Sequence, residues 1–559
     1  TGPESSTTKG GVAGNHNTGA TSLNFICITT ADELEKYTKT TRPNHAKWAV
    51  ALYLDGGSFD GGIVVSSDAL VIPTKENQIF GGWYVNSDLS GASAATLETG
   101  KIYYAKYIPD SGSCGAEGNE SNVTWKLTVN NDDVTSPTYT LTISGNGAMA
   151  DFMTVSNGKE TELDRPWKSL ESQITSIVIE DTVTYIGSYA FARIANCTSI
   201  SIGTGVTEIA KRAFSWITVE YTLNFNNTTS LKTLTQAFRD STGLKSITIP
   251  ASVTAIGDRT FRGCSGLTTV SFGENSQLET LGSQAFYQAT NLASVDLSST
   301  KLTEIGEAAF SDAAALSDVK MPDTITEIQN QAFIGCTALS NITLPSTIAT
   351  IGQEAFKNCT SLKSIVLPAT VTTIDKSAFD GCSSLHSVDM TAVPTAVSIA
   401  QGNNDYSFRN LAETNIVYIS DSSVLSKLSS DRHIVAITNG GTFAADTEFK
   451  SDKLAAPIKE GFIFTGWYDN AKCTGNAVTT PSTGKTYYAK WIELKADAIT
   501  PEYGSTSSSF PTIEGVTLTT GSPATVLLSP LRTVSSRQTR WAKPPSPPRP
   551  PQKPVARAP

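Results

Sequence analysis

Residues Ile351 to Pro368 read "IGQEAFKNCTSLKSIVLP", and their pattern specifies the type of fold. The piece "SIVL" alternates polar and apolar residues, as a half-buried strand does. The Gly of "IG" predicts a turn, and the Phe of "AF" is a large ring that can fill an interior. The same order of pieces recurs on both sides of this stretch, which is therefore one unit of an array.

The period of the array can be followed through the Phe that comes after Ala or Thr in each unit. These residues are Phe191, Phe214, Phe238, Phe261, Phe286, Phe310, Phe333, Phe356 and Phe379, at spacings of 23, 24, 23, 25, 24, 23, 23 and 23. The apolar centres of the strand pieces keep the same period. They are Ile177, Ile200, Leu223, Ile247, Val270, Val295, Val319, Ile342, Ile365 and Val388. Because the Phe positions and the apolar strand centres keep the same period, the chain contains a true repeat.

A repeat of this length predicts a solenoid. One unit cannot bury its own apolar face, so successive units must stack into coils. The strand pieces of neighbouring coils then pair in parallel, at about 4.8 Å, and build one long curved sheet. The "AF" piece is expected on the convex side, with its Phe filling the coil interior.

Three units carry a resemblance to a known family. They are "TAIGDRTFRGCSGLTTVSF" (254–272), "TEIGEAAFSDAAALSDVKM" (303–321) and "TTIDKSAFDGCSSLHSVDM" (372–390). They resemble the BspA-type leucine-rich repeat, the 23-residue Treponema-type class. The resemblance implies a right-handed solenoid with a parallel concave sheet and short irregular or helical convex segments. It spans residues 170–431, where "TNIVYISDSSVLSKLSSD" (414–431) is expected to be the C-terminal cap. Residues 109–169 are similar to the β-rich region that leads into such arrays.

Two further segments resemble each other. "FGGWYVNSDLSG" begins at Phe80 and "FTGWYDNAKCTG" begins at Phe464. "TGKIYYAKYI" and "TGKTYYAKWI", which end at Ile108 and Ile492, are separated by the same offset. Both copies resemble the Listeria–Bacteroides repeat, also called the internalin B-repeat, which implies small β-grasp-like modules at 46–108 and 432–494. Core packing is favoured over a sugar platform for their recurring aromatic residues. These are Trp83, Tyr84, Tyr103 and Tyr104, and Trp467, Tyr468, Tyr487 and Tyr488.

Charge and composition exclude several classes of protein. The 559 residues carry a formal net charge of −10. The segment 532–559 contributes seven positive charges and no acid, so the rest of the chain stands at −17. Such an acidic body argues against nucleic acid as a partner. No apolar run is long enough to predict a membrane span. Residues 1–45 are left unassigned, and residues 495–559 are expected to be a disordered tail, first Ser/Thr-rich and then Pro-rich and basic.

Four of the eight cysteines occupy one position of the repeat, three residues after the Phe. They are Cys264, Cys336, Cys359 and Cys382. A disulfide or metal ladder is one interpretation of this column. A small buried hydrophobic residue is the other, and it is favoured because other coils place Ser241 or Ala314 at comparable positions. No CxxC pair supports zinc.

No residue pattern predicts catalysis, a metal or a cofactor. The four histidines, His16, His45, His386 and His433, have no metal-binding spacing. The chain contains no nucleophile elbow, phosphate loop, dinucleotide fingerprint or calcium loop. The expectation is a protein that is not an enzyme, with no catalytic or metal-ligating residues.

The variable positions of each strand piece are the candidate binding face. By alternation they point away from the core: Ser246, Thr248, Thr269, Ser271, Ser294, Asp296, Asp318, Lys320, Asn341, Thr343, Ser364, Val366, Ser387 and Asp389. Rigid strands that present short hydroxyl side chains lose little entropy on binding. Solubility of the sheet is the alternative role for these residues.

The resemblance to the BspA family implies a bacterial cell-surface or secreted adhesin that binds host matrix, plasma or cell-surface proteins. An envelope spacer without a specific ligand, and glycan binding by the flanking modules, are the alternatives. The chain shows no leader and no anchor motif. The resemblance implies an extracellular or cell-surface location, so a signal peptide and an anchor are expected outside this chain.

Overall fold

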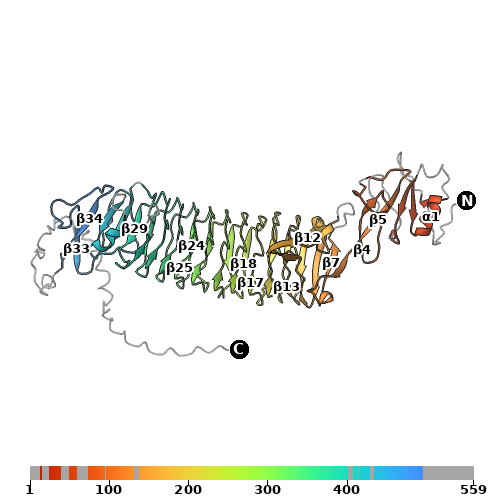
Figure 1. Ribbon diagram of the computed structural model, residues 1–559, viewed down its shortest axis with the longest axis horizontal. Helices are drawn as coiled ribbons and strands as arrows, with labels where there is room; N and C mark the ends of the chain where they lie inside the picture. The colour runs from red at the N-terminus through yellow and green to blue at the C-terminus, as the bar shows by residue number, and fades with distance from the viewer. Residues whose placement is uncertain are drawn as a thin grey trace, which may run out of the picture.

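The computed structural model is an elongated molecule (Figure 1), with the first module near one end, the coils in the middle and the second module at the other end. The structure describes residues 13–14, 24–39, 49–59, 73–94, 96–130, 137–400, 407–412, 414–428 and 433–494. The expected tail at residues 495–559 lies outside these ranges. No helix in the described part of the chain combines the length and apolarity of a bilayer-spanning segment.

The first module is a mixed sheet with one helix. Its elements are β1 (Ala13–Gly14), β2 (Asn24–Ile28), α1 (Ala31–Lys39), β3 (Ala49–Tyr53), β4 (Gln78–Tyr84) and β5 (Ile102–Pro109). The sheet order is β1-β2-β3-β5-β4. Trp83 and Tyr103 are buried in its core. Strand β2 pairs in parallel with β3, so part of the unassigned segment 1–45 belongs to the sheet of this module.

A β-rich cap joins this module to the coils. It consists of β6 (Ser111–Ser113), η2 (Glu120–Asn122), β7 (Val123–Val129), β8 (Tyr139–Gly145), β9 (Gly147–Ala148), β10 (Met153–Ser156), β11 (Lys159–Glu162) and η3 (Lys168–Gln173). Strand β8 pairs in parallel with the first coil strand, and Leu141 lies beside Ile177. The cap therefore continues the sheet of the coils. It also covers the apolar face of the first coil.

Long strands form one face of the coils, as the repeat predicts. They are β12 (Ile174–Ile179), β14 (Ser199–Ser201), β16 (Thr222–Asn224), β18 (Ser246–Ile249), β20 (Thr269–Phe272), β22 (Ser294–Asp296), β24 (Asp318–Lys320), β27 (Ser364–Val366) and β29 (Ser387–Met390). Their pairings are parallel, and they match the apolar centres of successive repeats, such as Val270 with Val295. Ile342 lies outside a strand but is buried in the same core.

A second row of parallel strands runs along the coils, which the repeat pattern did not predict. It consists of β13 (Val183–Ile186), β15 (Glu208–Ile209), β17 (Thr233–Leu234), β19 (Ala255–Ile256), β21 (Thr280–Leu281), β23 (Glu304–Ile305), β25 (Glu327–Ile328), β26 (Thr350–Ile351), β28 (Thr373–Ile374) and β30 (Ser398–Ile399). Most of these strands have two residues, which is too short for a recognisable alternation. The second residue of each two-residue strand in this row from β15 to β28 is a buried Ile or Leu, as in Ile256 and Ile351.

The segment around each repeat Phe is a tight turn, and no α-helix occurs between residues 137 and 400. The residues two before and two after the Phe both have left-handed backbones, for example Gln284 (φ 57°) and Gln288 (φ 58°) around Phe286. Gly supplies the second of these at Gly335 (φ 74°) without strain. The convex segments were expected to be irregular or helical. The structure shows irregular turns, so the helical form is not adopted.

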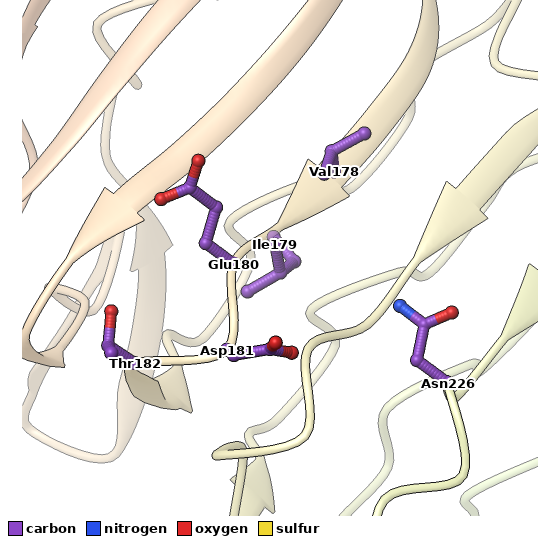
Figure 2. Close-up of a pocket in the computed structure, with 6 residues that line it drawn as sticks. All are labelled: Val178, Ile179, Glu180, Asp181, Thr182 and Asn226. Atoms are coloured by element: carbon purple, nitrogen blue, oxygen red, sulfur yellow. The ribbon is translucent and has the colours of Figure 1, made fainter.

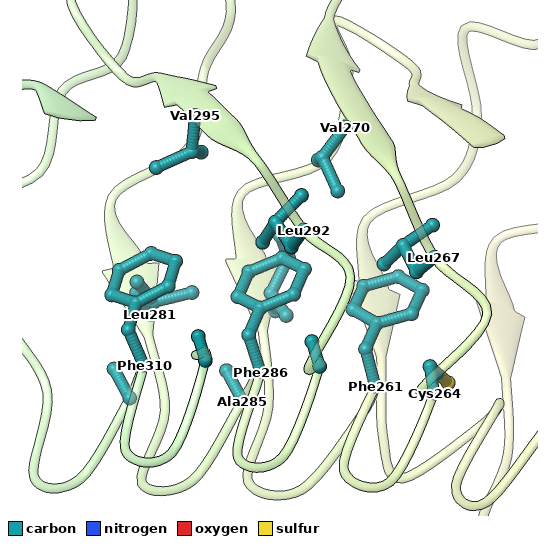
Figure 3. Close-up of a cluster of buried hydrophobic side chains, with 14 of the residues drawn as sticks. Phe261, Cys264, Leu267, Val270, Leu281, Ala285, Phe286, Leu292, Val295 and Phe310 are labelled. Carbon is teal, nitrogen blue, oxygen red and sulfur yellow. The ribbon is translucent and has the colours of Figure 1, made fainter. Parts of the chain in front are cut away.

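The Phe rings stack into a continuous ladder inside the coils, part of which is shown in Figure 3. Adjacent centroids are 5.1 to 5.7 Å apart, and adjacent rings are tilted by 2° to 17°. Trp167 of the cap begins the ladder and Phe408 ends it. The sequence register had stopped at Phe379, because the segment between Phe379 and Phe408 is irregular and longer than one repeat.

The second module is fused to the last coil through one sheet. Its elements are β31 (Ile416–Ile419), η4 (Ser422–Lys427), β32 (Ile434–Ile437), β33 (Phe462–Tyr468) and β34 (Thr486–Glu493). The sheet order is β27-β29-β31-β32-β34-β33, so coil strands and module strands follow one another without a break. Strand β31, expected in the cap of the solenoid, also belongs to the module.

Candidate functional site

The face of the long strands is the candidate binding surface, and most of the predicted residues are exposed on it. Eleven of them lie in the exposed class and Ser364 is half-buried. We call these twelve the open face: Ser246, Thr248, Thr269, Ser271, Ser294, Asp296, Asp318, Lys320, Asn341, Thr343, Ser364 and Val366. The buried residue between each pair, such as Val295 between Ser294 and Asp296, packs into the core and fixes the strand.

The last two predicted residues are buried, which corrects their expected exposure. Ser387 is 0% exposed and Asp389 is 5% exposed. They pair with Ile416 and Tyr418 of β31. Those two side chains belong to the core of the second module, together with Trp467. The module therefore closes the face at this end, and the alternation rule failed because strand β29 is buried on both sides.

A sequence signal for this closure was available. "IVYI" (416–419) and "IVAI" (434–437) are continuous apolar runs, which are typical of strands that are covered on both faces. Both strands are buried throughout in the structure. Alternation was therefore the wrong pattern to apply where these strands join the sheet.

Polar contacts between neighbouring coils organise the open face. The hydroxyls of Thr248 and Ser271 are 2.8 Å apart across two strands. Lys320 Nζ lies 3.1 Å from the Asp296 carboxylate. The Ser298 hydroxyl donates to that carboxylate and, with Lys320, holds the pKa of Asp296 below its usual range. Asp296 is therefore ionised at neutral pH, and the face combines hydroxyl groups with a few charges.

Asp389 at the closed end is an unusual carboxyl group. It accepts hydrogen bonds from the backbone N and the hydroxyl of Thr391, at 2.9 and 2.7 Å. Burial nevertheless raises its pKa, because removal from water disfavours the charged form. The acid thus destabilises the junction between coil and module once it ionises.

We expect Asp389→Asn to stabilise the protein at pH 7. The pKa of Asp389 is higher in the folded than in the unfolded protein. Asp389 therefore adds to the free energy of unfolding below about pH 4, the usual pKa of Asp. This contribution is lost as the pH rises through the folded pKa. Urea unfolding of both proteins between pH 3 and pH 7 checks this. The variant's advantage should shrink toward acid pH. An advantage that stays constant with pH would contradict the assignment to ionisation.

The cysteine column is a row of buried thiols. Cys264, Cys336, Cys359 and Cys382 are 0% exposed. Each thiol lies within hydrogen-bond distance of the carbonyl of the Phe in the preceding coil, at 3.0 to 3.2 Å. The Ser241 hydroxyl makes the same contact in its coil. All eight cysteines are free, and the alanine at this position is Ala313 rather than Ala314.

Native thiol labelling should spare this column. Burial raises the pKa of these thiols, to about 12 for Cys382, so almost no thiolate is present at pH 8. We expect no alkylation of the four residues before unfolding and complete alkylation in guanidinium. Half-buried Cys27 should react first among the described cysteines. Peptide mass spectrometry after iodoacetamide treatment checks this, and rapid modification of Cys359 in the native protein would contradict it.

An open hollow lies next to the first coil and was missed from the sequence. It has a volume of about 410 Å³ and is lined by Val178, Ile179, Glu180, Asp181, Thr182 and Asn226 (Figure 2). Its two acids come from the turn after β12. The Asp181 carboxylate accepts a hydrogen bond from the Thr204 backbone, and the Asn226 amide donates to Ser201. These groups mainly hold neighbouring coils together.

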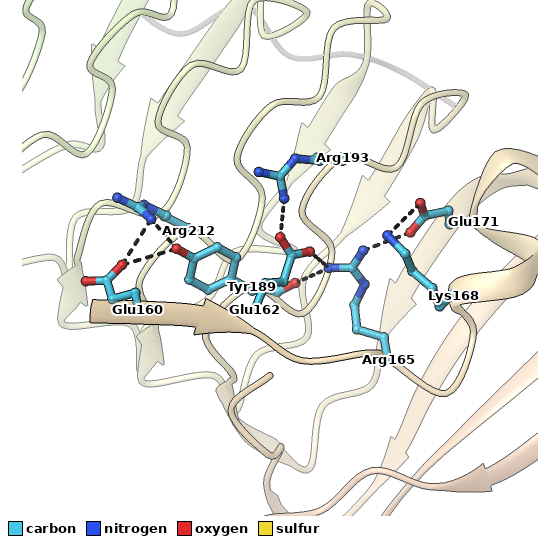
Figure 4. A network of polar contacts seen from close by, with 8 residues as sticks. All are labelled: Glu160, Glu162, Arg165, Lys168, Glu171, Tyr189, Arg193 and Arg212. Carbon is cyan, nitrogen blue, oxygen red and sulfur yellow. Dashed lines mark hydrogen bonds and ion pairs between the residues drawn. The ribbon is translucent and has the colours of Figure 1, made fainter. Parts of the chain in front are cut away.

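A polar network fastens the β10–β11 hairpin to the first coils (Figure 4). The buried Arg165 guanidinium donates to Glu162, Glu171 and the Tyr189 carbonyl, at 2.8, 2.8 and 2.9 Å. On the other side, Glu160 pairs with Lys211 and Arg212 of the second coil. The network is structural, because its charges are paired with one another.

The described side chains were also compared with the requirements of a metal site. Within the described ranges, no group of three or more His, Cys, Asp or Glu side chains is arranged to hold a metal ion. Four of the eight module aromatics belong to the module cores, namely Trp83, Tyr103, Trp467 and Tyr487. Tyr104 and Tyr488 are half-buried outside these cores, and Tyr488 packs against the core of the coils.

Parallel coils that repeat around one apolar core define the protein as a leucine-rich repeat solenoid. Residues 169–275, 231–333 and 303–428 match the family model described as BspA type leucine rich repeat region, in six copies. Residues 59–106 and 437–490 match the Listeria-Bacteroides repeat domain. Residues 169–428 therefore form a BspA-type leucine-rich repeat region, and two Listeria–Bacteroides repeat domains flank it.

Several solved structures are similar to parts of this chain. A leucine rich cell surface protein from Faecalibacterium prausnitzii is 23% identical, over 56% of this chain and 96% of that protein, with a TM-score of 0.27. A leucine-rich repeat protein from Bacteroides ovatus is 20% identical, over 52% and 92%, with a TM-score of 0.25. The pneumococcal vaccine antigen PcpA is 18% identical, over 58% and 96%, with a TM-score of 0.26. No curated protein matches the chain.

Proposed function

We propose that this protein is a bacterial surface protein that binds other proteins through the open face, without catalysis. The observation that carries the proposal is the row of exposed, mostly short polar side chains over successive coils, from Ser246 to Thr343. The strands beneath are fixed by parallel pairing and by the ring ladder. A rigid surface loses little conformational entropy when a partner binds.

The chemistry of the open face suits a protein partner with complementary polar groups. Hydroxyls can donate or accept hydrogen bonds, so they adapt to backbone and side-chain groups alike. Val366, 54% exposed, is the one large apolar side chain among the twelve. It lies beside the end that the second module closes, since Asp389 is its neighbour in β29. We expect a protein partner to make its apolar contact at this end of the open face.

A matched pair of substitutions tests the proposal. Thr248→Arg places a long charged side chain on the open face, whereas Thr280→Arg places the same side chain at an exposed position of the second row of strands. Binding of the full chain to a panel of matrix, plasma and cell-surface proteins is measured by biolayer interferometry. We expect Thr248→Arg to weaken any saturable binding about tenfold and Thr280→Arg to leave it unchanged.

The opposite results would redirect the assignment. Equal binding by both variants would place the ligand site elsewhere on the chain. Absence of saturable binding to every protein on the panel would favour a spacer in the cell envelope. The continuous sheet from β27 to β33 supports this second candidate, because it makes coils and module one stiff unit.

A further inference from the structure

The two modules share one more strand and one more helical segment than the matching motifs at 80–108 and 464–492 include. In the first module the order is β2, α1, β3, β4 and β5, and in the second it is β31, η4, β32, β33 and β34. The pairings correspond one by one: two parallel pairs, then one antiparallel pair. Each module is therefore a five-element unit that begins with a strand and a helical segment.

The registers of the two units agree residue by residue. Leu52 of β3 and Ala436 of β32 are equivalent, since each pairs with the first Tyr of the Tyr-Tyr-Ala-Lys piece in its own module. On their other side, Leu52 pairs with Cys27 and Ala436 pairs with Tyr418. Cys27 and Tyr418 therefore occupy the same place in the leading strands. Both side chains pack against the core of their own module.

The sequences of the leading segments also correspond. "NFICITTADELEK" (24–36) aligns with "NIVYISDSSVLSK" (415–427), with Asn, Ile, Leu and Lys identical at four positions. Each helical segment starts after a polar residue that caps it. The Thr30 hydroxyl accepts from the Glu33 backbone, and the Asp421 carboxylate accepts from the Ser423 backbone. The duplication thus includes the strand that precedes the helix.

In the second unit, the outer edge of the leading strand carries the last coil of the solenoid. Strand β31 pairs in parallel with β29 at four positions, from Ser387 with Ile416 to Met390 with Ile419. Val424 of η4 is buried in the coil core. Lys427 Nζ donates to the carbonyls of the last coil, including that of Val397 at 2.7 Å. This edge is a built contact surface for a leucine-rich repeat coil.

In the first unit, the same edge carries only a short antiparallel bridge among the described residues. Strand β1 pairs at Phe25 and Ile26, and its described pairing does not reach Cys27 or Ile28. Helix α1, which directly follows β2, lies at the outer end of the molecule, away from the coils (Figure 1), and in the sheet order β2 lies next to β1 on the side opposite β4. The first module is thus placed to cap something on that side.

The opposite edge of each module is unsuited to the same role. Strands β4 and β33 carry a bulge beside Gly82 (φ 114°) and Gly466 (φ 139°), where the register shifts. Bulges on edge strands interrupt the ladder and discourage further pairing. The leading strand is therefore the edge on which a coil can dock.

We infer that the outer edge of β2 is a docking edge for the last coil of a leucine-rich repeat array that enters from the N-terminal side of the same polypeptide. The coil strand adds in parallel, in the register that β29 shows against β31. The module then closes the core of that array, as the second module closes the core of this one. The first module is in this sense a joint between two solenoids.

A tandem chain tests this inference. Residues 1–23 of the full chain are replaced by a second copy of residues 109–414, so that the added array leads into Asn24 as Thr414 leads into Asn415. The register places Asp389 of the added copy opposite Cys27, since Asp389 pairs with Tyr418. Neighbouring strands lie about 4.8 Å apart, which is within disulfide range. Asp389→Cys in the added copy should therefore form a disulfide with Cys27 on mild oxidation.

Two comparisons make the test decisive. Val388→Cys in the added copy points to the other face of the strand and should not cross-link to Cys27. In a second tandem chain, the added copy is residues 109–494, which carries its own closing module and does not need β2. Hydrogen exchange of the β2 amides should be at least about tenfold slower in the first tandem chain than in the second.

Three results would overturn the inference. They are equal β2 exchange in the two tandem chains, a cross-link to Cys27 from position 388 but not from position 389, and aggregation of the first tandem chain while the second folds. In the last case β2 cannot close the added array. The β1 bridge would then be the native completion of this edge.

Discussion

Phe310→Ala should lower the free energy of unfolding of the solenoid by about 3–5 kcal/mol. Phe310 is 0% exposed and stacks between Phe286 and Phe333, at 5.3 and 5.4 Å. Removal of the ring leaves a cavity and breaks the ladder in its middle. Because each coil contacts only its neighbours, the loss should be felt as separate unfolding of the two halves. Guanidinium unfolding followed by circular dichroism measures it.

Two further variants separate the ladder from simple volume. Phe310→Leu retains much of the apolar volume and should cost about 1–1.5 kcal/mol. Phe408→Ala removes the last ring, which has one ladder neighbour in the described chain, and should cost less than Phe310→Ala. If Phe310→Ala and Phe408→Ala lower the free energy of unfolding equally, the rings in the middle of the ladder do not contribute more than the last ring, and the prediction is wrong.

Arg165→Ala should destabilise the N-terminal cap by about 3–5 kcal/mol. The Arg165 side chain is 0% exposed, and its removal leaves Glu162 and Glu171 without their buried partner. The Tyr189 carbonyl also loses its donor. We expect faster hydrogen exchange in the β10–β11 hairpin and in the first coil, together with a lower unfolding midpoint.

Arg193→Ala is the matched control in the same network. Arg193 pairs with the same carboxylate, Glu162, and its guanidinium lies 4.1 Å from the Trp216 ring centre. Its side chain is 47% exposed, so water screens the ion pair, and the loss should be about 1 kcal/mol. If both variants lose the same stability, burial is not what makes Arg165 important.

The repeat register predicted the core of the coils well, because every coil reuses the same apolar positions. Ile247, Val270 and Val295 were assigned to strand centres and lie there, buried and paired. The second row of strands was missed, since pairs such as Thr280–Leu281 are too short to alternate. Their pairing depends on the stacking of coils, which local sequence does not encode.

Alternation predicted the exposure of side chains correctly in the middle of the candidate face and wrongly at its end. Alternation placed Thr248 and Asn341 outward, and both are exposed. It also placed Ser387 outward, although this residue is fully buried. Alternation describes one strand in isolation, whereas exposure depends on what packs above it. The second module supplies that cover from residues much later in the chain, such as Trp467.

The solenoid, its period, the interior position of its Phe residues and the presence of two related modules could all be inferred from the amino-acid sequence, because each of these repeats in the chain. Where the modules attach became visible only in the folded chain. Strand β31 completes the module and closes the last coil at the same time, a double role that appears only when β29 and β32 lie on its two sides. Edges and covers of a sheet are set by long-range pairing, so they depend on neighbours in space and not in sequence.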